Sequence, residues 1–148
     1  MAQLNSFEEL DCWKVSTELR RELMKAVDRF PDKEKYALVS QIRRASRSVT
    51  NNIAEGFGRY HFQEFIQFCR ISRGSLTELL DHVIIAQDEG YLTPEEVKSY
   101  RLKIDKALAL VNGLIRYLKR SQQEGRAEEP ESIYVKVAGN ETPLTFNE

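Results

Sequence analysis

The sequence predicts an all-α protein, folded as an antiparallel up-and-down four-helix bundle. Four segments repeat apolar residues at steps of three and four, which is the period of a helix buried along one face. Their connections are short and carry proline or glycine, which favours neighbouring helices that reverse direction. Only residues 133–137 resemble a strand, and one isolated strand of that length cannot form a sheet.

Charge divides the 148 residues into a domain over 1–122 and a tail over 123–148. Lys and Arg number 22 against 23 Asp and Glu, a formal charge of −1. The domain carries 20 basic and 17 acidic residues, net +3, whereas the tail carries 2 and 6, net −4. The glycine, proline and acidic residues of the tail are typical of a segment that buries little apolar area, so we expect it to be disordered.

Composition excludes several classes of protein. The apolar residues never form a run long enough to span a bilayer. The opening residues, MAQLNSFEEL, lack a basic stretch followed by an apolar one, so we expect no secretory signal and a cytoplasmic protein. Two cysteines and two histidines are too few for a disulfide framework or for a zinc site of four such ligands.

The first helix is expected to begin near Phe7, after a capping box of Ser6 and Glu9, and to end at Pro31. Its apolar stripe contains Cys12, Val15, Leu19, Leu23, Ala26, Val27 and Phe30. A second, weaker strip on another side contains Leu10, Trp13, Thr17 and Met24. Because a helix in a closed monomeric bundle needs only one stripe, the second strip suggests a further packing partner.

The second helix is predicted after Phe30-Pro31-Asp32, and its apolar positions are Leu38, Ile42, Ala45, Val49, Ile53 and Phe57. At 100° per residue, three arginines fall on its opposite face, Arg43, Arg44 and Arg47. They alternate there with Ser40, Thr50, Asn51, Ala54 and Gly58. Small side chains on that face would let a backbone or a phosphate come close.

The third helix has an apolar stripe of Phe62, Phe65, Cys69, Ser72, Leu76, Leu79, Leu80 and Val83 and ends at Glu89-Gly90. Arg73 falls on the margin of this stripe, where a guanidinium needs a carboxylate, and Glu55 and Glu78 are the candidates. The fourth helix begins with a capping box of Thr93 and Glu96 around Pro94. Its stripe is Val97, Tyr100, Ile104, Ala107, Leu108, Val111, Ile115 and Leu118.

The residues give no support to enzyme chemistry, and we predict no catalytic residue, cofactor or small-molecule substrate. Di-iron bundles use Glu-x-x-His pairs, whereas Glu78 precedes His82 by four residues, so we expect no metal and read His61 and His82 as surface side chains. Cys12 and Cys69 lie on apolar stripes, where a thiol behaves as a small hydrophobe. No nucleophile elbow or phosphate-binding glycine loop occurs.

Residues 41–73 hold six arginines against Glu55 and Glu64, a local charge of +4. The candidate surface for nucleic acid or a partner protein comprises Arg43, Arg44, Arg47, Arg59 and Arg70. The alternatives are an ordinary solvated helix face, or ion pairs with acidic residues of another subunit. Composition alone favours these alternatives, because a pI near 6.2 lacks the basic excess typical of nucleic-acid binders.

Four stretches resemble a known bacterial family: SQIRRA (residues 40–45), SVTNNIAEGFGR (48–59), EFIQF (64–68) and SRGSLTEL (72–79). The family is the four-helix-bundle family named for proteins encoded in intervening sequences of 23S ribosomal RNA genes. The resemblance covers roughly residues 7–121 and implies a ring-like homopentamer without enzymatic activity. One branch is the accessory protein of diversity-generating retroelements, which binds reverse transcriptase and nucleic acid through a basic barrel surface.

The most specific part of the resemblance is Asn-Ile-Ala-Glu-Gly followed by Arg-Gly-Ser. We expect a structural role for its residues: Asn52 and Glu55 would hold an arginine such as Arg73, and Gly56 and Gly74 would let helices approach closely. Two hypotheses therefore remain for the chain. It is either a homo-oligomer that binds RNA or a partner such as a reverse transcriptase, or an interaction module whose arginines pair between subunits, without a membrane role in either case.

Overall fold

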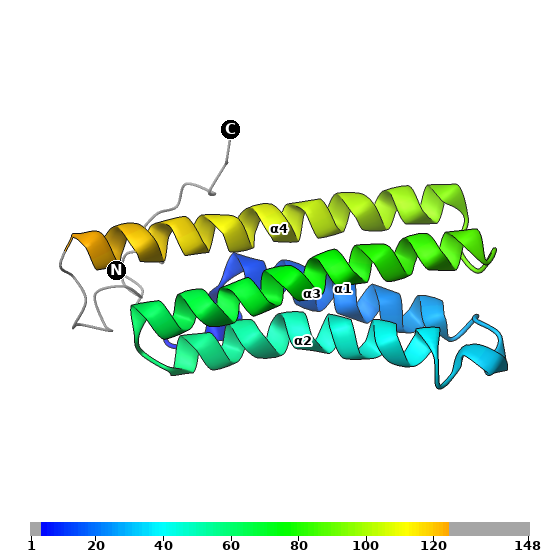
Figure 1. Cartoon of the computed structure of the whole chain (residues 1–148), viewed down its shortest axis with the longest axis horizontal. Helices are drawn as coiled ribbons and strands as arrows, with labels where there is room; N and C mark the ends of the chain where they lie inside the picture. Colours follow the sequence, from blue (N-terminus) through cyan, green and yellow to red (C-terminus); the bar gives the residue numbers. More distant parts are fainter. Residues whose placement is uncertain (1–3, 125–148) are drawn as a thin grey trace.

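The computed structural model describes residues 4–124 and shows four α-helices beside one another (Figure 1). They are α1 (Asp11–Val27), α2 (Leu38–Gly58), α3 (Phe62–Asp88) and α4 (Pro94–Gln123), with short 3-10 helices η1 (Phe7–Glu9) and η2 (Asp32–Glu34). The described residues contain no strand, which confirms the all-α, four-helix prediction. The strand-like stretch at 133–137 and almost all of the predicted tail lie outside the described residues.

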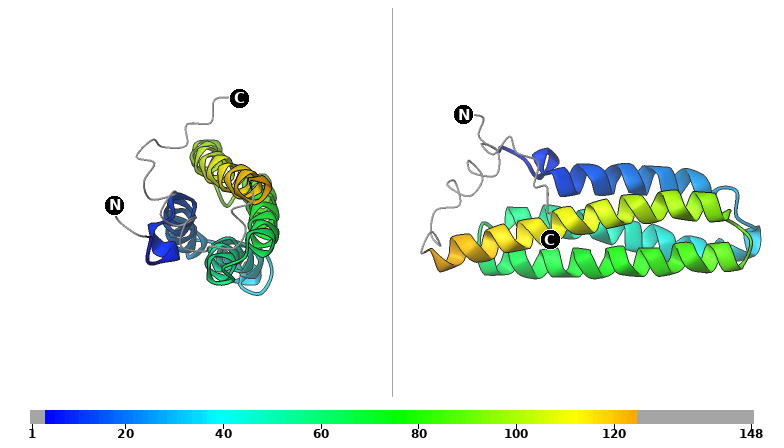
Figure 2. Two further views of the ribbon diagram at one scale, coloured as in Figure 1. Left: turned by 90° about the vertical axis from the view of Figure 1, so that its left-hand side faces the viewer. Right: turned by 90° about the horizontal axis from the view of Figure 1, so that it is seen from above.

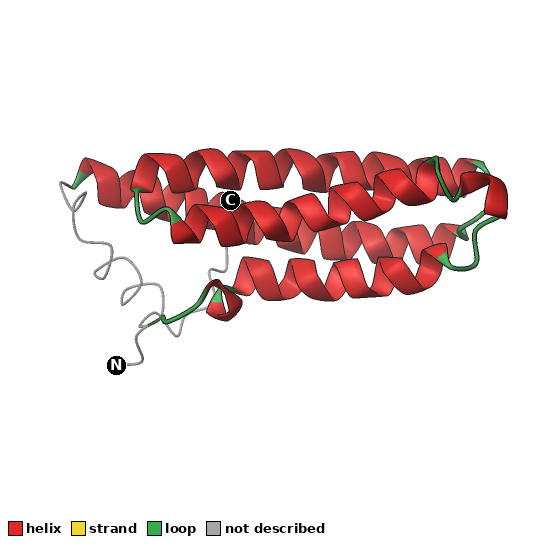
Figure 3. Cartoon of the chain, turned by 90° about the horizontal axis from the view of Figure 1, so that it is seen from below, coloured by secondary structure: helices red, strands yellow, loops and turns green. Residues whose placement is uncertain are grey.

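Each helix packs against two neighbours. Seen from the end, the helices occupy the corners of a four-sided bundle in the order α1, α2, α3, α4 (Figure 2). The most extensive packing joins α3 to α2 and to α4, whereas α1 packs less extensively against α2 and α4. The α2–α3 connection lies at one end of the bundle, and the α1–α2 and α3–α4 connections lie at the other (Figure 3).

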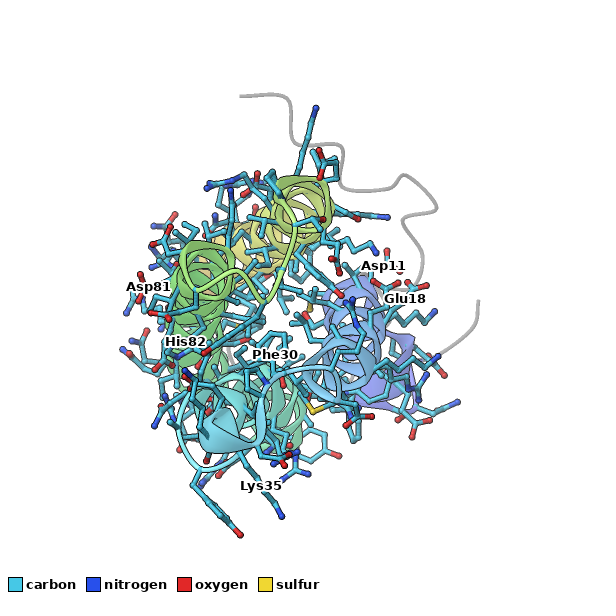
Figure 4. The ribbon with its side chains drawn as sticks, turned by 90° about the vertical axis from the view of Figure 1, so that its right-hand side faces the viewer. Asp11, Glu18, Phe30, Lys35, Asp81 and His82 are labelled. Atoms are coloured by element: carbon cyan, nitrogen blue, oxygen red, sulfur yellow. The ribbon has the colours of Figure 1, made fainter. Side chains whose placement is uncertain are left out.

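The predicted apolar stripes form the core. All their members are buried except Val15, Leu80 and Leu108, which are partly buried and pack against it. Phe30 points into the interior between the helices (Figure 4). Full burial of a large apolar side chain stabilises the fold by about 1.5–3 kcal/mol. Side chains below 2% exposure come from every helix, and the largest include Leu19, Leu23, Ile42, Ile53, Leu76, Leu79, Ile104 and Leu118.

The first helix begins later than the sequence predicts. The Ser6 hydroxyl accepts a hydrogen bond from the Glu8 backbone N–H at 3.2 Å and caps only η1. Leu10 is then extended, and α1 starts at Asp11 and ends at Val27, before Pro31. The Phe7 ring lies 5.3 Å from Trp13 and 6.5 Å from Phe57, centroid to centroid. Because Phe7 packs against residues of both α1 and α2, η1 does not continue along the axis of α1.

The second apolar strip of α1 is covered largely within the chain. Leu10 and Thr17 are buried, and Trp13 packs edge-on against Phe7. A helix at a corner of the bundle faces two neighbours, so its apolar surface is wide. The inference of a further partner from this strip was therefore unnecessary.

The start of α4 matches its prediction. The Glu96 N–H donates to the Thr93 hydroxyl at 3.1 Å, and the Thr93 N–H donates to the Glu96 carboxylate at 3.3 Å, which completes the capping box. Gly90 in the preceding turn has φ +79°, a left-handed conformation that glycine adopts without a steric penalty. None of the described helices is both long and apolar enough to cross a membrane.

Candidate nucleic-acid interface

The outward face of α2 carries a shallow depression of about 470 Å³. The side chains that line it all come from this helix: Ser40, Arg43, Arg44, Arg47, Ser48, Asn51, Asn52 and Glu55. They gather because α2 buries Ile42, Val49 and Ile53 on the opposite side, and successive residues turn by 100°. Three of the five predicted binding arginines therefore share one surface.

Two of these three guanidinium groups are not neutralised within the described chain. Arg43 is half-buried and Arg47 is exposed, and neither forms an ion pair with a described residue. Arg44 differs, because it donates to the Gln41 side chain at 3.0 and 3.2 Å and pairs with Glu78 of α3. The surface thus keeps a positive field near Arg43 and Arg47.

Arg59 lies at the C-terminal end of α2 and already has a partner. Its guanidinium forms an ion pair with Glu55 at 2.9 Å, one turn earlier. It also lies 5.3 Å from the centroid of the Phe68 ring. Because both members of the pair are about half exposed, the pair adds little stability, but it offsets the charge of Arg59.

Arg70 lies away from the other arginines. It is on α3, three residues before Arg73, so the two side chains leave the helix about 60° apart. Arg73 Nη1 donates to the Asn112 side chain of α4 at 3.0 Å. Arg70 is therefore on the α4 side of α3, and the structure does not bring it to the outward face of α2.

The predicted partner of Arg73 is wrong. Glu55 pairs with Arg59, and Glu78 pairs with Arg44, so neither carboxylate meets Arg73. The helical turn explains the difference. The Ser72 hydroxyl donates to the Val49 carbonyl of α2 at 2.9 Å, and a step of 100° turns Arg73 away from α2 toward α4.

Asn52 also differs from its predicted role of holding an arginine. Its amide donates to the Ser48 carbonyl at 2.7 Å and to the Ser48 hydroxyl at 3.1 Å. The hydroxyls of Ser48 and Ser75 lie 2.8 Å apart, which links this amide to α3. Hydrogen bonds of Ser48, Ser75 and Ser72 therefore join α2 to α3 at the place where an arginine was expected.

Of the two motif glycines, only Gly56 lies at a close approach. A Cβ there would lie 2.6 Å from Phe65 Cδ2 and 2.8 Å from Phe68 Cβ, so no side chain fits without movement. Gly74 is exposed, and a Cβ there would meet nothing within 4 Å. The expectation of a close helix approach is therefore wrong for Gly74 within one chain.

One polar residue, Asn112, was missed in the sequence, and another, Thr50, was assigned to the wrong face of its helix. Asn112 was not singled out, although a polar residue between Leu108 and Ile115 at helical spacing is the signal that would have found it. Thr50, expected on the outward face, is buried, and its hydroxyl donates to the Arg47 carbonyl at 3.2 Å.

His82 and the cysteines offer little chemistry. His82 lies on α3 toward α2 (Figure 4), and its side chain is only 12% exposed, so the surface assignment was wrong for it. Its Nε2 lies 3.5 Å from the Glu78 carboxylate, and no three metal-ligating side chains gather within residues 4–124. Burial raises the pKa of the Cys12 thiol to about 12 and also raises the pKa of Cys69, so both thiols stay protonated at neutral pH.

Comparison with known proteins decides the family. The model of the 23S rRNA-intervening sequence protein family matches residues 8–113, which span α1, α2, α3 and most of α4. The chain belongs to this family. The match confirms the resemblance seen in the Asn-Ile-Ala-Glu-Gly region, while the link to the retroelement branch of the 23S rRNA-intervening sequence proteins stays a prediction. A search of curated proteins found no match.

Proposed function

We propose that this chain is a non-enzymatic, cytoplasmic RNA-binding protein, built as an antiparallel up-and-down bundle that assembles into a ring-like homo-oligomer. The observation that carries the RNA-binding proposal is the depression on α2, where Arg43 and Arg47 have no acidic partner among the described residues. Guanidinium groups on an open surface neutralise phosphates and release counterions. The family, whose genes are associated with 23S rRNA, suggests an RNA-related role, and for this reason we take RNA as the polyanion.

Assembly would multiply this modest surface. Ile71 is 52% exposed and Ile85 37% exposed on the outer side of α3, with the open position of Gly74 between them along the helix. Leu102 of α4 is 64% exposed. Apolar side chains scattered singly in this way also occur on monomers, so the proposal of assembly is based on the family resemblance. Light scattering should then give a mass of about five subunits, as the family resemblance implies, and a monomeric mass would contradict the assembly.

Salt dependence tests the RNA proposal. We expect filter binding of a single-stranded RNA to weaken as salt rises, with a logarithmic slope of about −1.4 if Arg43 and Arg47 each neutralise one phosphate. Arg43→Ala and Arg47→Ala should each weaken binding and make the slope shallower by about 0.7. Arg101→Ala on α4, which removes one exposed positive charge from another helix, is the matched control.

The outcomes separate the proposal from its alternative. Absence of binding at low salt, or an affinity that added salt leaves unchanged, would contradict RNA binding through this surface. The alternative is an interaction module without nucleic-acid binding, whose arginines pair between subunits. Arg44 and Arg59 already pair within the chain, so Arg43 and Arg47 are the arginines that it would use. Its partner would be another subunit, whereas a nucleic-acid-processing protein such as a reverse transcriptase belongs to the first proposal, as a second class of ligand for the same arginines. A reverse transcriptase gene with a template repeat beside the gene for this chain would favour that partner.

A further inference from the structure

A second groove, of about 360 Å³, lies where η1 and α1 meet α2. These three elements are in contact, and Figure 2 shows α1 beside α2. The groove is lined by Phe7, Trp13, Arg20, Arg47, Thr50, Asn51 and Ala54. Arg47 and Asn51 also line the depression on α2, so the two concave regions adjoin across these two side chains.

The groove combines a fixed aromatic surface with uncompensated positive charge. Trp13 is half-buried, and its ring is held edge-on by Phe7 at 5.3 Å between centroids. Arg20 from α1 and Arg47 from α2 stand on opposite walls, and neither forms an ion pair with a residue in 4–124. Thr50 is buried and its hydroxyl donates its proton to the Arg47 carbonyl, so Asn51 is the neutral side chain of the groove that is free to donate.

Size and chemistry together restrict the ligand. The volume is near the lower limit of small-ligand sites, about 300–1,000 Å³, so the groove takes one flat group and not a helix of nucleic acid. An indole ring binds a base by its π-face, and a base becomes available for this only when it is unpaired. Guanidinium groups on both walls match the phosphates that flank such a base.

We propose that the groove between η1–α1 and α2 binds one unpaired base of a single-stranded RNA. Trp13 stacks on the base, Arg20 and Arg47 hold the flanking phosphates, and the Asn51 amide contacts the base edge. The strand continues onto the outward face of α2, because Arg47 belongs to both surfaces. This inference rests on the proposed function and narrows it from RNA in general to single strands.

Trp13 itself reports on the proposal, because it is the only tryptophan in the chain. The full-length protein is titrated with a short oligouridine and with a duplex of the same length, at low salt. Indole fluorescence is excited at the red edge of its band, where RNA does not absorb. We expect saturable quenching by the single strand and little quenching by the duplex, with filter binding measured on the same samples.

Substitutions distinguish RNA binding in the groove from a general attraction of RNA to positive charge. Arg20→Ala should weaken oligouridine binding several-fold, whereas Arg21→Ala, which removes the same charge from the exposed side of α1, should have a smaller effect. Trp13→Leu should weaken binding about tenfold, within the range for loss of one base–aromatic stack, and Trp13→Phe should restore most of it. Circular dichroism and thermal unfolding of each variant establish that the bundle is folded.

Each outcome has one meaning. RNA that is retained on filters without quenching Trp13, or equal losses for the Arg20 and Arg21 variants, would overturn the groove and leave the proposed function standing. Equal quenching by the duplex would overturn the preference for an unpaired base. If neither RNA binds at low salt, both the groove and the proposed function fail.

Discussion

Gly56 shows how one absent side chain sets the spacing of two helices. Its hydrogen faces Phe65 and Phe68 of α3, which occupy the space that a Cβ would need. The sequence predicted this close approach at both motif glycines, because a glycine inside a helix otherwise costs stability. It could not tell which one faces a neighbour, since that depends on how α3 is rotated about its own axis.

Exchange of each glycine for alanine should change stability in opposite directions. Gly56→Ala should lower the free energy of unfolding by about 1–2 kcal/mol, because overpacking against Phe65 exceeds the gain in helix propensity. Gly74→Ala should raise it by about 0.5–1 kcal/mol, because its surroundings are open. Urea unfolding measures both values. A loss of stability for Gly74→Ala would show that the outer face of α3 is packed in the assembled protein.

Arg73 and Asn112 should be energetically coupled. The hydrogen bond of 3.0 Å between them joins α3 to α4 in a partly buried position. A double-mutant cycle with Arg73→Met and Asn112→Ala should give a coupling energy of about 1 kcal/mol. The cycle of Arg73→Met with Glu55→Gln is the control and should be additive. Coupling to Glu55 instead of Asn112 would restore the partner that the sequence suggested.

The two predicted capping boxes show what local sequence can and cannot predict. Thr93 and Glu96 form their box because Pro94 and the glycine turn before it leave the chain no competing conformation. Ser6 and Glu9 have the same spacing, but contacts of Phe7 with Trp13 and Phe57 favour a separate 3-10 turn. The Phe7–Phe57 contact joins residues that are distant in the sequence, so helical periodicity does not predict it.

The first turn of α4 should make stability depend on pH. The hydrogen bond from Arg29, at 2.6 Å, is the main cause that holds the pKa of Glu96 below its usual 4.5, and the Thr93 N–H adds to it. Because the folded pKa is lower than the unfolded one, the stabilisation is present above about pH 4.5 and is lost as pH falls through the folded pKa. The wild type should therefore lose more stability than Glu96→Gln between neutral pH and about pH 3.

The glutamine variant isolates the charge, since glutamine also fits the third position of a capping box. Glu95→Gln in the same turn is the matched control, because Glu95 is exposed and forms no ion pair with a described residue. It should follow the wild-type profile when thermal unfolding is measured across this pH range. Identical profiles for the wild type and Glu96→Gln would contradict the role of the Arg29–Glu96 pair.

At the scale of the whole molecule, sequence predicted the four helices and the shared face of Arg43, Arg44 and Arg47 but not the complete site. Periodicity places side chains around one helix, so it found the three arginines of α2. It does not fix the rotation of one helix against another, so Arg70 was grouped with them although it is on the α4 side of α3. The groove at Trp13 was missed for the same reason.

The charge of the whole chain leads to the last prediction. Residues 125–148 carry five glutamates against Arg126 and Lys136, net −3, so the chain that ends at Glu124 has a charge of −1 − (−3) = +2. Removal of these residues should strengthen RNA binding, because their field opposes the attraction of phosphates to α2. Screening shortens that field to about 10 Å at 0.1 M salt, so the gain should shrink as salt rises.

A full-length variant with the five glutamates changed to glutamine separates charge from chain length. It should bind RNA as tightly as the truncated chain at low salt, and both should exceed the wild type in filter binding. Equal affinity of all three proteins at low salt would show that the charge of these residues does not affect RNA binding at α2. Tighter binding by the truncated chain alone would mean that residues 125–148 block the surface by their volume, because the glutamine variant keeps the length and loses only the charge.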